Sequence, residues 1–147
     1  MSSALILLAP LRGGAADAAR AAIAALDEPF AGVPGTHLAR VQVLEDDRML
    51  LAADHDGELE PWLIAAAREL DAVLAHCAGW PGADDSAAVL RWARGRQLEA
   101  GFSVVAARNA TVEEIGAALA LRERLARFAA DTDGLEDEAL HAAWRAR

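Results

Sequence analysis

Three polar side chains in two neighbouring segments have the chemistry to bind or convert a small molecule. They are Arg40, Gln42 and His55. A guanidinium can bind or polarise a carbonyl or a carboxylate. An imidazole can transfer a proton, because the ordinary pKa of histidine is close to neutrality. We therefore interpret Arg40 and His55 as candidate catalytic residues, and Gln42 as a residue that orients the substrate.

These residues belong to two segments, Thr36–Leu44 and Met49–Asp56, whose patterns predict β-strands. The connection between them, 45–48, is short and polar, so we expect an antiparallel hairpin. A turn centred on Asp46 and Asp47 predicts the pairs Leu44 with Met49, Gln42 with Leu51, Arg40 with Ala53, and Leu38 with His55.

Alternation along the two strands separates their side chains into two faces. One face is apolar and suits a cover of helices: Ala39, Val41, Val43, Leu50 and Ala52. The other face carries Leu38, Arg40, Gln42, Leu44, Met49, Leu51, Ala53 and His55. Apolar walls with a few polar groups are typical of a small-molecule site. The predicted substrate-binding residues are Gln42, Leu38, Leu51, Met49, and Trp80 from a loop beside the pocket.

Each of these residues also has a structural interpretation. Arg40 and Gln42 could hydrogen-bond across a dimer interface, since a buried guanidinium needs a partner. His55 could be an ordinary histidine near a strand end, and Trp80 could be a packing residue. The sequence leaves both interpretations open.

The remaining pattern completes an α+β fold. Leu5–Leu8 predicts a first strand, and 15–26 predicts a helix. A helical stripe runs from Leu59 to Cys77, and a short helix with Asp84 or Asp85 as its N-cap ends at Arg94. Phe102–Ala107 predicts a fourth strand. A capping box at 111–114 starts a further helix.

The resulting order is βαββαβ, with an extra short helix before the last strand and a helix after it. This is the ferredoxin-like plan, a four-stranded antiparallel sheet with helices on one face. We expect a second copy of the chain to cover the other face. The domain predicted is 1–130, and 131–147 is an acidic tail with a short amphipathic helix.

Composition excludes several classes of function. The chain has 147 residues, with 14 basic and 23 acidic side chains, so its formal charge is 14 − 23 = −9. Such a charge argues against nucleic acid and against an anionic membrane surface as partners. The single cysteine, Cys77, allows no internal disulfide, and we expect a reducing, cytoplasmic location.

The histidines, the cysteine and the aspartates also bear on metal and haem sites. His37, Asp54, His55 and Asp56 are close along the hairpin, but alternation places His55 and the two aspartates on opposite faces, and no metal site is predicted. A single histidine or cysteine can hold haem, which makes His76 and Cys77 formal candidates. Cys77 fits the core stripe of its helix, which favours a buried, inert thiol.

Three segments together resemble a known group of domains: 35–40 (GTHLAR), 50–57 (LLAADHDG) and 76–82 (HCAGWPG). They are similar to ferredoxin-like, dimeric α+β-barrel domains that occur alone or alongside haem peroxidase-type and other oxidative enzymes. The similarity runs from about Leu5 to Leu125. Leu38, His55 and Trp80 depart from the aromatic or tyrosine residues usual in that family. The resemblance implies the fold and a homodimer.

Related barrels include cofactor-free monooxygenases, cyclases, isomerases and haem-degrading enzymes, so the fold alone does not select a reaction. The leading hypothesis is a cofactor-independent enzyme of the monooxygenase, cyclase or isomerase type that acts on an apolar small molecule. One alternative is a non-catalytic dimeric accessory or binding module that works beside a haem or other oxidative enzyme. The other alternative is a haem-binding protein.

Overall fold

The structure is a computed structural model that describes residues 2–99 and 110–146. The chain divides into two compact units, one that ends at Val112 and one that begins at Glu113. The sequence pattern predicts a boundary at residue 130 instead, so the long helix that precedes this position belongs to the second unit.

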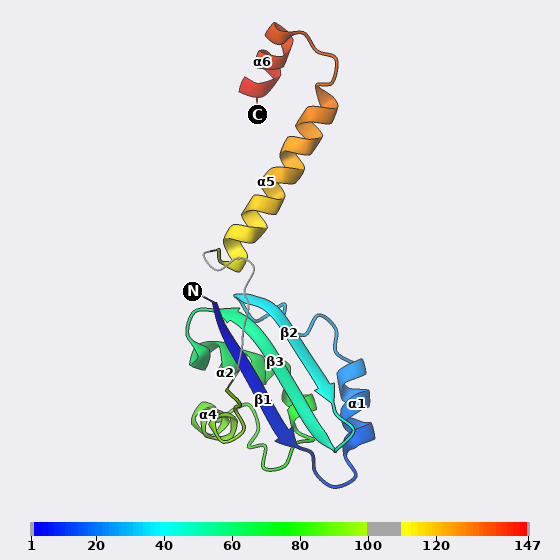
Figure 1. The fold of residues 1–147 in the computed structure, drawn as a ribbon, viewed down its shortest axis with the longest axis vertical. Coiled ribbons are helices and arrows are strands. Elements are labelled where there is room, and N and C mark those ends of the chain that lie inside the picture. Colours follow the sequence, from blue (N-terminus) through cyan, green and yellow to red (C-terminus); the bar gives the residue numbers. More distant parts are fainter. Residues whose placement is uncertain (1, 100–109, 147) are drawn as a thin grey trace. The chain divides into compact units, whose positions relative to one another are not determined.

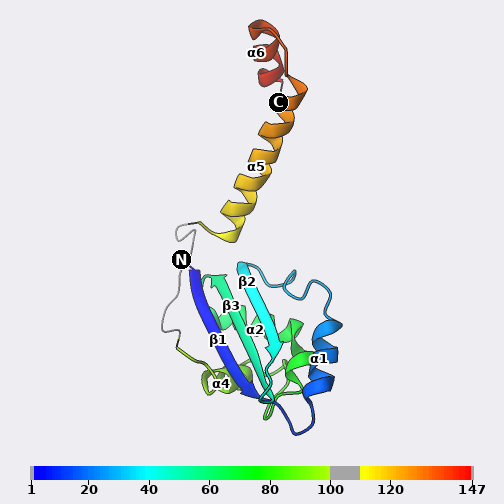
Figure 2. The ribbon, with the colours of Figure 1, turned by 45° about the vertical axis from the view of Figure 1, so that its right-hand side comes forward.

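The first unit contains an antiparallel sheet of three strands, in the order β1-β3-β2. The strands are β1 (Ser2–Pro10), β2 (Thr36–Val43) and β3 (Arg48–Asp56). Figure 1 shows them in front of α2 (Leu59–Glu69), and Figure 2 shows the same layering after rotation. In the described part of this unit, helices pack against one face of the sheet and leave the other face open.

The helices of this unit follow the sequence pattern closely. They are α1 (Ala16–Ala24), α2, α3 (Asp71–Leu74) and α4 (Ser86–Arg94). The predicted stripe from Leu59 to Cys77 is divided into α2 and α3 around Leu70. Of the two predicted N-cap candidates of α4, the structure selects Asp85, whose carboxylate accepts a hydrogen bond from the Ala88 backbone N–H at 2.9 Å.

The core lies between the sheet and these helices. Leu5, Leu7, Met49 and Leu51 of the strands are almost completely buried against Leu70 and other helix residues. Each of these strand residues has an odd number, as alternation along a strand requires. The side chains of the open face are therefore those with even numbers, such as Ile6 and Leu50.

The hairpin of β2 and β3 is confirmed, but its predicted register is wrong by one residue. Val43 pairs with Met49, and the Leu44 backbone N–H donates to the Arg48 carbonyl at 2.7 Å. The loop thus contains three residues, 45–47, and not four. Asp47 has a positive φ of 54°, which is typical of a three-residue hairpin loop that ends in a left-handed residue.

The predicted fourth strand, Phe102–Ala107, lies outside the described residues. The described chain just before it pairs with the free edge of β1: Gln97 forms an antiparallel bridge with Leu7. The Leu8 N–H donates to the Arg96 carbonyl at 3.0 Å, and the Leu98 N–H donates to the Ile6 carbonyl at 2.9 Å. The sheet that the structure describes has three strands, with the segment at 96–98 against its β1 edge.

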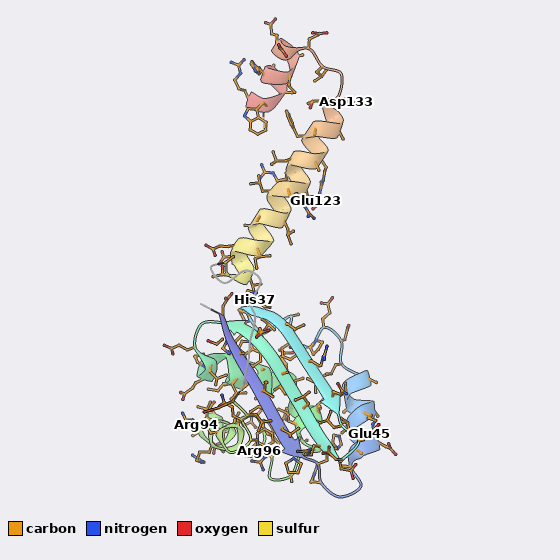
Figure 3. The ribbon with its side chains drawn as sticks, viewed as in Figure 1. His37, Glu45, Arg94, Arg96, Glu123 and Asp133 are labelled. Carbon is orange, nitrogen blue, oxygen red and sulfur yellow. The ribbon has the colours of Figure 1, made fainter. Side chains whose placement is uncertain are left out.

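The second unit consists of two helices, α5 (Val112–Asp131) and α6 (Asp137–Arg145), of which α5 begins at the last residue of the first unit. Figure 3 labels Glu123 on α5 and Asp133 in the connection between the helices. Phe128 of α5 meets Trp144 of α6 edge to face, with ring centroids 5.2 Å apart. Within residues 2–99 and 110–146, no helix has both the length and the apolar character needed to cross a bilayer.

Candidate functional site

The open face of the sheet is the part of the predicted site that the structure keeps. The register aligns its side chains in three rows across β1, β3 and β2. The rows are Ala4, Asp54 and Leu38; then Ile6, Ala52 and Arg40; then Leu8, Leu50 and Gln42. We call these residues the open sheet face.

The open sheet face is apolar, with polar groups on two of its strands. Leu38 has 60% of its surface exposed, and Arg40 and Gln42 are exposed beside it on β2. Asp54 on β3 is half-buried, as are Ile6, Leu8 and Leu50. A guanidinium, a carboxamide and a carboxylate thus lie on β2 and β3 beside an apolar surface, which is the composition expected of a small-molecule site or an interface.

His55, Met49 and Leu51 do not share a face with Arg40, contrary to the sequence prediction. All three are buried, and His55 has no exposed surface. The three-residue loop explains the error, because it pairs odd-numbered residues with odd-numbered residues: Met49 with Val43, and Leu51 with Val41. Arg40 therefore lies beside Ala52, and His55 lies on the face that the helices cover.

The imidazole of His55 is held by the start of α2. It stacks on the indole of Trp62, with ring centroids 4.7 Å apart and planes 13° from parallel. His55 Nδ1 lies 3.2 Å from the Asp56 backbone carbonyl, which can only accept a hydrogen bond. Nε2 has no hydrogen-bond partner among the described residues. This arrangement fixes the ring within the core, away from the open sheet face.

A second polar group lies at the end of the hairpin opposite the loop, where β2 begins. The register shifts between Thr36 and Leu38, so His37 is an extra residue on β2. His37 Nε2 donates to Asp56 Oδ1 at 2.9 Å, and both side chains are more than four-fifths buried. Figure 3 labels His37 at this end of the hairpin and Glu45 at the loop end.

Asp56 is an anchored carboxylate. The backbone N–H of Val112, the last residue of the first unit, donates to its Oδ2 at 2.8 Å. This hydrogen bond is the main cause that lowers the pKa of Asp56, and the His37 imidazole lowers it further against the effect of burial. Asp56 is therefore a stable anion with two donors, which favours a structural role for this pair over acid–base chemistry.

A hollow of about 260 Å³ lies next to this pair. Val33, Pro34, Pro61 and Trp62 contribute apolar wall, and Asp56 and Glu58 contribute carboxylates. Trp62 is only 4% exposed, and its Nε1–H donates to Thr36 Oγ1 at 2.9 Å. The hollow is separate from the open sheet face, since its wall includes the covered indole of Trp62.

Trp80 and Cys77 belong to the helical side of the first unit. Trp80 Nε1–H donates to Asp71 at 2.8 Å, and its ring meets Trp92 edge to face. Trp80 packs against the core, so the structure does not bring it together with Arg40 and Gln42. Its packing interpretation is the one that the contacts favour.

The Cys77 thiol does not fit the role of a haem ligand. The side chain is 1% exposed, and its thiol contacts the Met49 sulfur at 3.7 Å. Burial raises the pKa of the thiol to about 11, although the Arg96 and Arg12 guanidinium groups oppose the increase. The group therefore stays protonated near neutral pH, whereas a haem ligand must be a thiolate. His76, its neighbour, is half-buried.

Within the described ranges, no group of three or more histidine, cysteine or acidic side chains is arranged to hold a metal ion. His37 and Asp56 do come together at one end of the hairpin. Asp54 lies on the open sheet face, away from the face predicted for it. The four residues that are close along the hairpin are thus divided between two faces of the sheet.

Sequence reasoning missed Ile6, Leu8, Leu50 and Asp54 as members of the open sheet face. The alternation of side chains within each strand is visible in the sequence. The predicted loop is one residue too long, however, and it therefore assigns side chains from opposite faces of β2 and β3 to one common face. Aspartate tolerates the left-handed conformation, so the pair Asp46–Asp47 in a short polar connection is the one feature of the sequence that indicates the three-residue loop.

Comparison of the chain with models of known families, with curated proteins and with solved structures found no match.

Proposed function

We propose that this protein is a homodimeric small-molecule-binding protein, and that its ligand lies on the open sheet face between two copies. The ligand class is an apolar molecule with one anionic or carbonyl group. Arg40 binds that group, Gln42 orients it, and Ile6, Leu8 and Leu50 contact the apolar part. Leu38 belongs to the contact with the second copy.

The observation that carries this proposal is the composition of the open sheet face. Leu38, Ile6, Leu8 and Leu50 form apolar surface that the described part of the first unit leaves uncovered. Burial of apolar surface stabilises association by roughly 25 cal/mol per Å². A guanidinium that enters such an interface needs an acceptor, and a ligand carboxylate or carbonyl provides one.

We further propose that the sheet is completed to the four-stranded ferredoxin-like form. The bridge between Leu7 and Gln97 supports this, because it is antiparallel and lies at the free edge of β1. A fourth strand in that position gives the order β4-β1-β3-β2 with every neighbour antiparallel. The resulting face is wide enough for two copies to pack sheet against sheet.

A binding function is better supported than a cofactor-independent enzyme. The residue expected to transfer a proton, His55, lies behind the sheet on Trp62. Arg40 and His55 therefore cannot act on one ligand in the proposed cavity. The monooxygenase, cyclase and isomerase hypotheses lose their acid–base residue, and the non-catalytic dimeric module becomes the leading proposal.

The proposal is tested with 8-anilinonaphthalene-1-sulfonate, an apolar fluorophore that carries one anionic group. Arg40→Ala should raise its dissociation constant about tenfold, which corresponds to roughly 1.4 kcal/mol and is the usual size of a charged hydrogen bond. His55→Leu should leave the constant unchanged within about twofold, since this side chain lies on the other face. Fluorescence titration measures all variants.

Two arginine variants serve as matched controls. Arg20→Ala removes an exposed guanidinium that pairs with Asp17 on α1. Arg124→Ala alters the apolar hollow between α5 and α6, which is another surface that could bind this fluorophore. Unchanged binding in Arg40→Ala together with weakened binding in Arg124→Ala would refute the proposal.

The dimer is tested separately by light scattering after size-exclusion chromatography. Leu38→Glu places a charge on the exposed leucine of the open sheet face, and should halve the native mass. Ala21→Glu, at an exposed position of α1, is the control for an added carboxylate, and should leave the mass unchanged. An unchanged mass in Leu38→Glu would contradict a sheet-to-sheet dimer.

A further inference from the structure

One acidic side chain of the open sheet face, Asp54, has no role in the proposed function. It lies on β3, which pairs with β1 on one side and with β2 on the other (Figure 2). Asp54 is half-buried, yet it makes no hydrogen bond or ion pair with any residue that the structure describes. A carboxylate that is partly removed from water needs a donor to compensate for the water it loses.

The next acidic residue of β3, Asp56, shows how this chain satisfies a carboxylate. Asp56 accepts hydrogen bonds from two donors, at 2.8 Å and 2.9 Å. The cross-strand neighbours of Asp54 are Ala4 on β1 and Leu38 on β2, whose side chains contain no polar atom. Within 2–99 and 110–146, the chain thus supplies donors to Asp56 and none to Asp54.

Arg40 is the positive charge of the open sheet face, and it is a diagonal neighbour of Asp54. Arg40 pairs with Ala52, and Asp54 pairs with Leu38 on the adjacent row. Diagonal neighbours on adjacent strands are about 7–8 Å apart, which is within the reach of long side chains. The two charges nevertheless form no ion pair, and Arg40 has no other polar partner in the described part of the chain. Opposite charges therefore lie near each other on this face, and both are available to a ligand.

Apolar side chains continue the surface from these charges toward β1. Ala52 and Ile6 follow Arg40 along its row, and Leu50 and Leu8 lie in the next row. A ligand that contacts all of these groups needs an anionic group, a cationic group and an apolar part close to one another. An α-amino acid with an apolar side chain carries all three on one carbon atom.

We propose that the ligand of the open sheet face is an apolar α-amino acid, whose carboxylate binds Arg40 and whose ammonium group binds Asp54. This inference rests on the proposed function and names the class of its ligand. The guanidinium donates to the ligand carboxylate, and the ammonium group donates to Asp54, so both contacts are charge-assisted hydrogen bonds. The side chain of the amino acid packs on Ile6 and Leu50. With this ligand bound, a second copy can cover the face without leaving either charge unpaired.

The experiment compares L-leucine with two analogues that each lack one charged group. 4-Methylpentanoate lacks the ammonium group, and 3-methylbutylamine lacks the carboxylate. The native full chain should bind L-leucine about tenfold more tightly than either analogue, because each analogue loses one charge-assisted contact. Isothermal titration calorimetry measures the three dissociation constants.

Two variants separate the roles of the charged side chains. Asp54→Asn keeps the shape of the side chain, and should weaken the binding of L-leucine about tenfold without weakening that of 4-methylpentanoate. Arg40→Ala should weaken L-leucine and 4-methylpentanoate by similar factors, without weakening 3-methylbutylamine. Asp84→Asn, at an exposed position before α4, is the matched control and should bind all three compounds like the native chain.

Three results would overturn the amino-acid assignment. They are L-leucine that does not bind, L-leucine that binds no more tightly than 4-methylpentanoate, and a preference for L-leucine that persists in Asp54→Asn. Light scattering identifies one cause of the last result, in which Asp54 pairs with Arg40 of the second copy and not with a ligand. Asp54→Asn would then halve the native mass and keep the preference.

These outcomes are distinguishable from failure of the proposed function. If 4-methylpentanoate binds as tightly as L-leucine and Arg40→Ala weakens both, the binding function stands and the amino-acid class fails. If Arg40→Ala binds both the fluorophore and 4-methylpentanoate like the native chain, the binding function itself fails, and the amino-acid assignment fails with it.

Discussion

His55 and Trp62 form a face-to-face pair in the core, with their ring planes 13° apart. Phe30 stacks on the same indole, with centroids 6.2 Å apart, so Trp62 contacts both the end of β3 and the loop that follows α1. Its Nε1–H also donates to Thr36 at the start of β2. One side chain of α2 therefore connects three separate parts of the first unit.

We expect Trp62→Ala to lower the free energy of unfolding of the first unit by about 3–5 kcal/mol, because it removes a large buried side chain and its hydrogen bond. Urea unfolding followed by circular dichroism measures the change. Trp144→Ala is the control, since this residue lies in the second unit and is 58% exposed. A loss below about 1 kcal/mol in Trp62→Ala would contradict its role in the core.

The lowered pKa of Asp56 predicts a dependence of stability on pH. A carboxyl whose pKa is lower in the folded state stabilises that state above its unfolded pKa, about 3.9. This contribution is lost as pH falls through the lower, folded pKa. Asp56→Asn should therefore be less stable than the native chain at pH 7, by about 1 kcal/mol, and the difference should disappear in acid.

His37→Gln tests the imidazole contribution to the same carboxylate. Val112 N–H is the larger cause of the lowered pKa, so this variant should keep most of the pH dependence. Thermal unfolding between pH 2 and pH 7, with both single variants and the double variant, gives the coupling free energy of the pair. Equal stability of Asp56→Asn and the native chain at pH 7 would exclude the anchoring role.

Cys77 should be unreactive in the folded protein. With a pKa of about 11, only about one thiol in a thousand is ionised at pH 8. Reaction with a chromogenic disulfide should therefore be at least about 100-fold slower in the folded state than in urea. Rapid reaction without denaturant would contradict the burial of this side chain.

The same thiol predicts a loss of stability in alkali. Its pKa is raised on folding from 9.0 to about 11, so the stabilising contribution is complete below pH 9. It is lost as pH rises toward 11, because the unfolded chain then ionises first. Cys77→Ala lacks this dependence, and a comparison of the two unfolding curves between pH 8 and pH 10.5 measures it.

The left-handed residue of the hairpin loop gives a prediction about stability. Asp47 has a φ of 54°, a conformation that costs most side chains about 1 kcal/mol and glycine almost nothing. Asp47→Gly should therefore raise the free energy of unfolding by up to about 1 kcal/mol, and Asp47→Val should lower it. Thermal unfolding measures the stability of both variants relative to the native chain.

Asp46→Gly is the control for this loop. Asp46 hydrogen-bonds to Arg48 and does not have a positive φ, so glycine at this position should not stabilise the chain. Stabilisation by Asp46→Gly and not by Asp47→Gly would indicate a four-residue loop and the register first predicted. The pair of variants thus tests the register directly.

Much of the first unit could be predicted because its signals are local. Leu5–Leu8, Met49–Asp56 and the cap at Asp85 depend on alternation, on helical spacing and on one side-chain acceptor. The strand order is a consequence of longer-range contacts, and the sequence offered it only through the general plan of the fold. The predicted strand at 102–107 lies outside the described residues and stays a prediction.

The candidate site was harder to predict, because it depends on how two strands combine. Arg40 and Gln42 were placed correctly relative to each other, since they are two residues apart on one strand. His55 was placed wrongly relative to them, because the relation between β2 and β3 depends on whether the loop has an odd or an even number of residues. The number of residues in the loop depends on the left-handed conformation of Asp47. The alternation of apolar and polar residues along the strands contains no information about that conformation.

The three-residue loop also has an evolutionary consequence for this chain. Insertion or deletion of one codon at positions 45–47 would leave every other residue unchanged, yet it would exchange which half of the β2 side chains faces the helices. Arg40 and Gln42 would then meet the interior, and Val41 would meet water. Natural variation at this turn should accordingly consist of substitutions, whereas changes in its length should be rare.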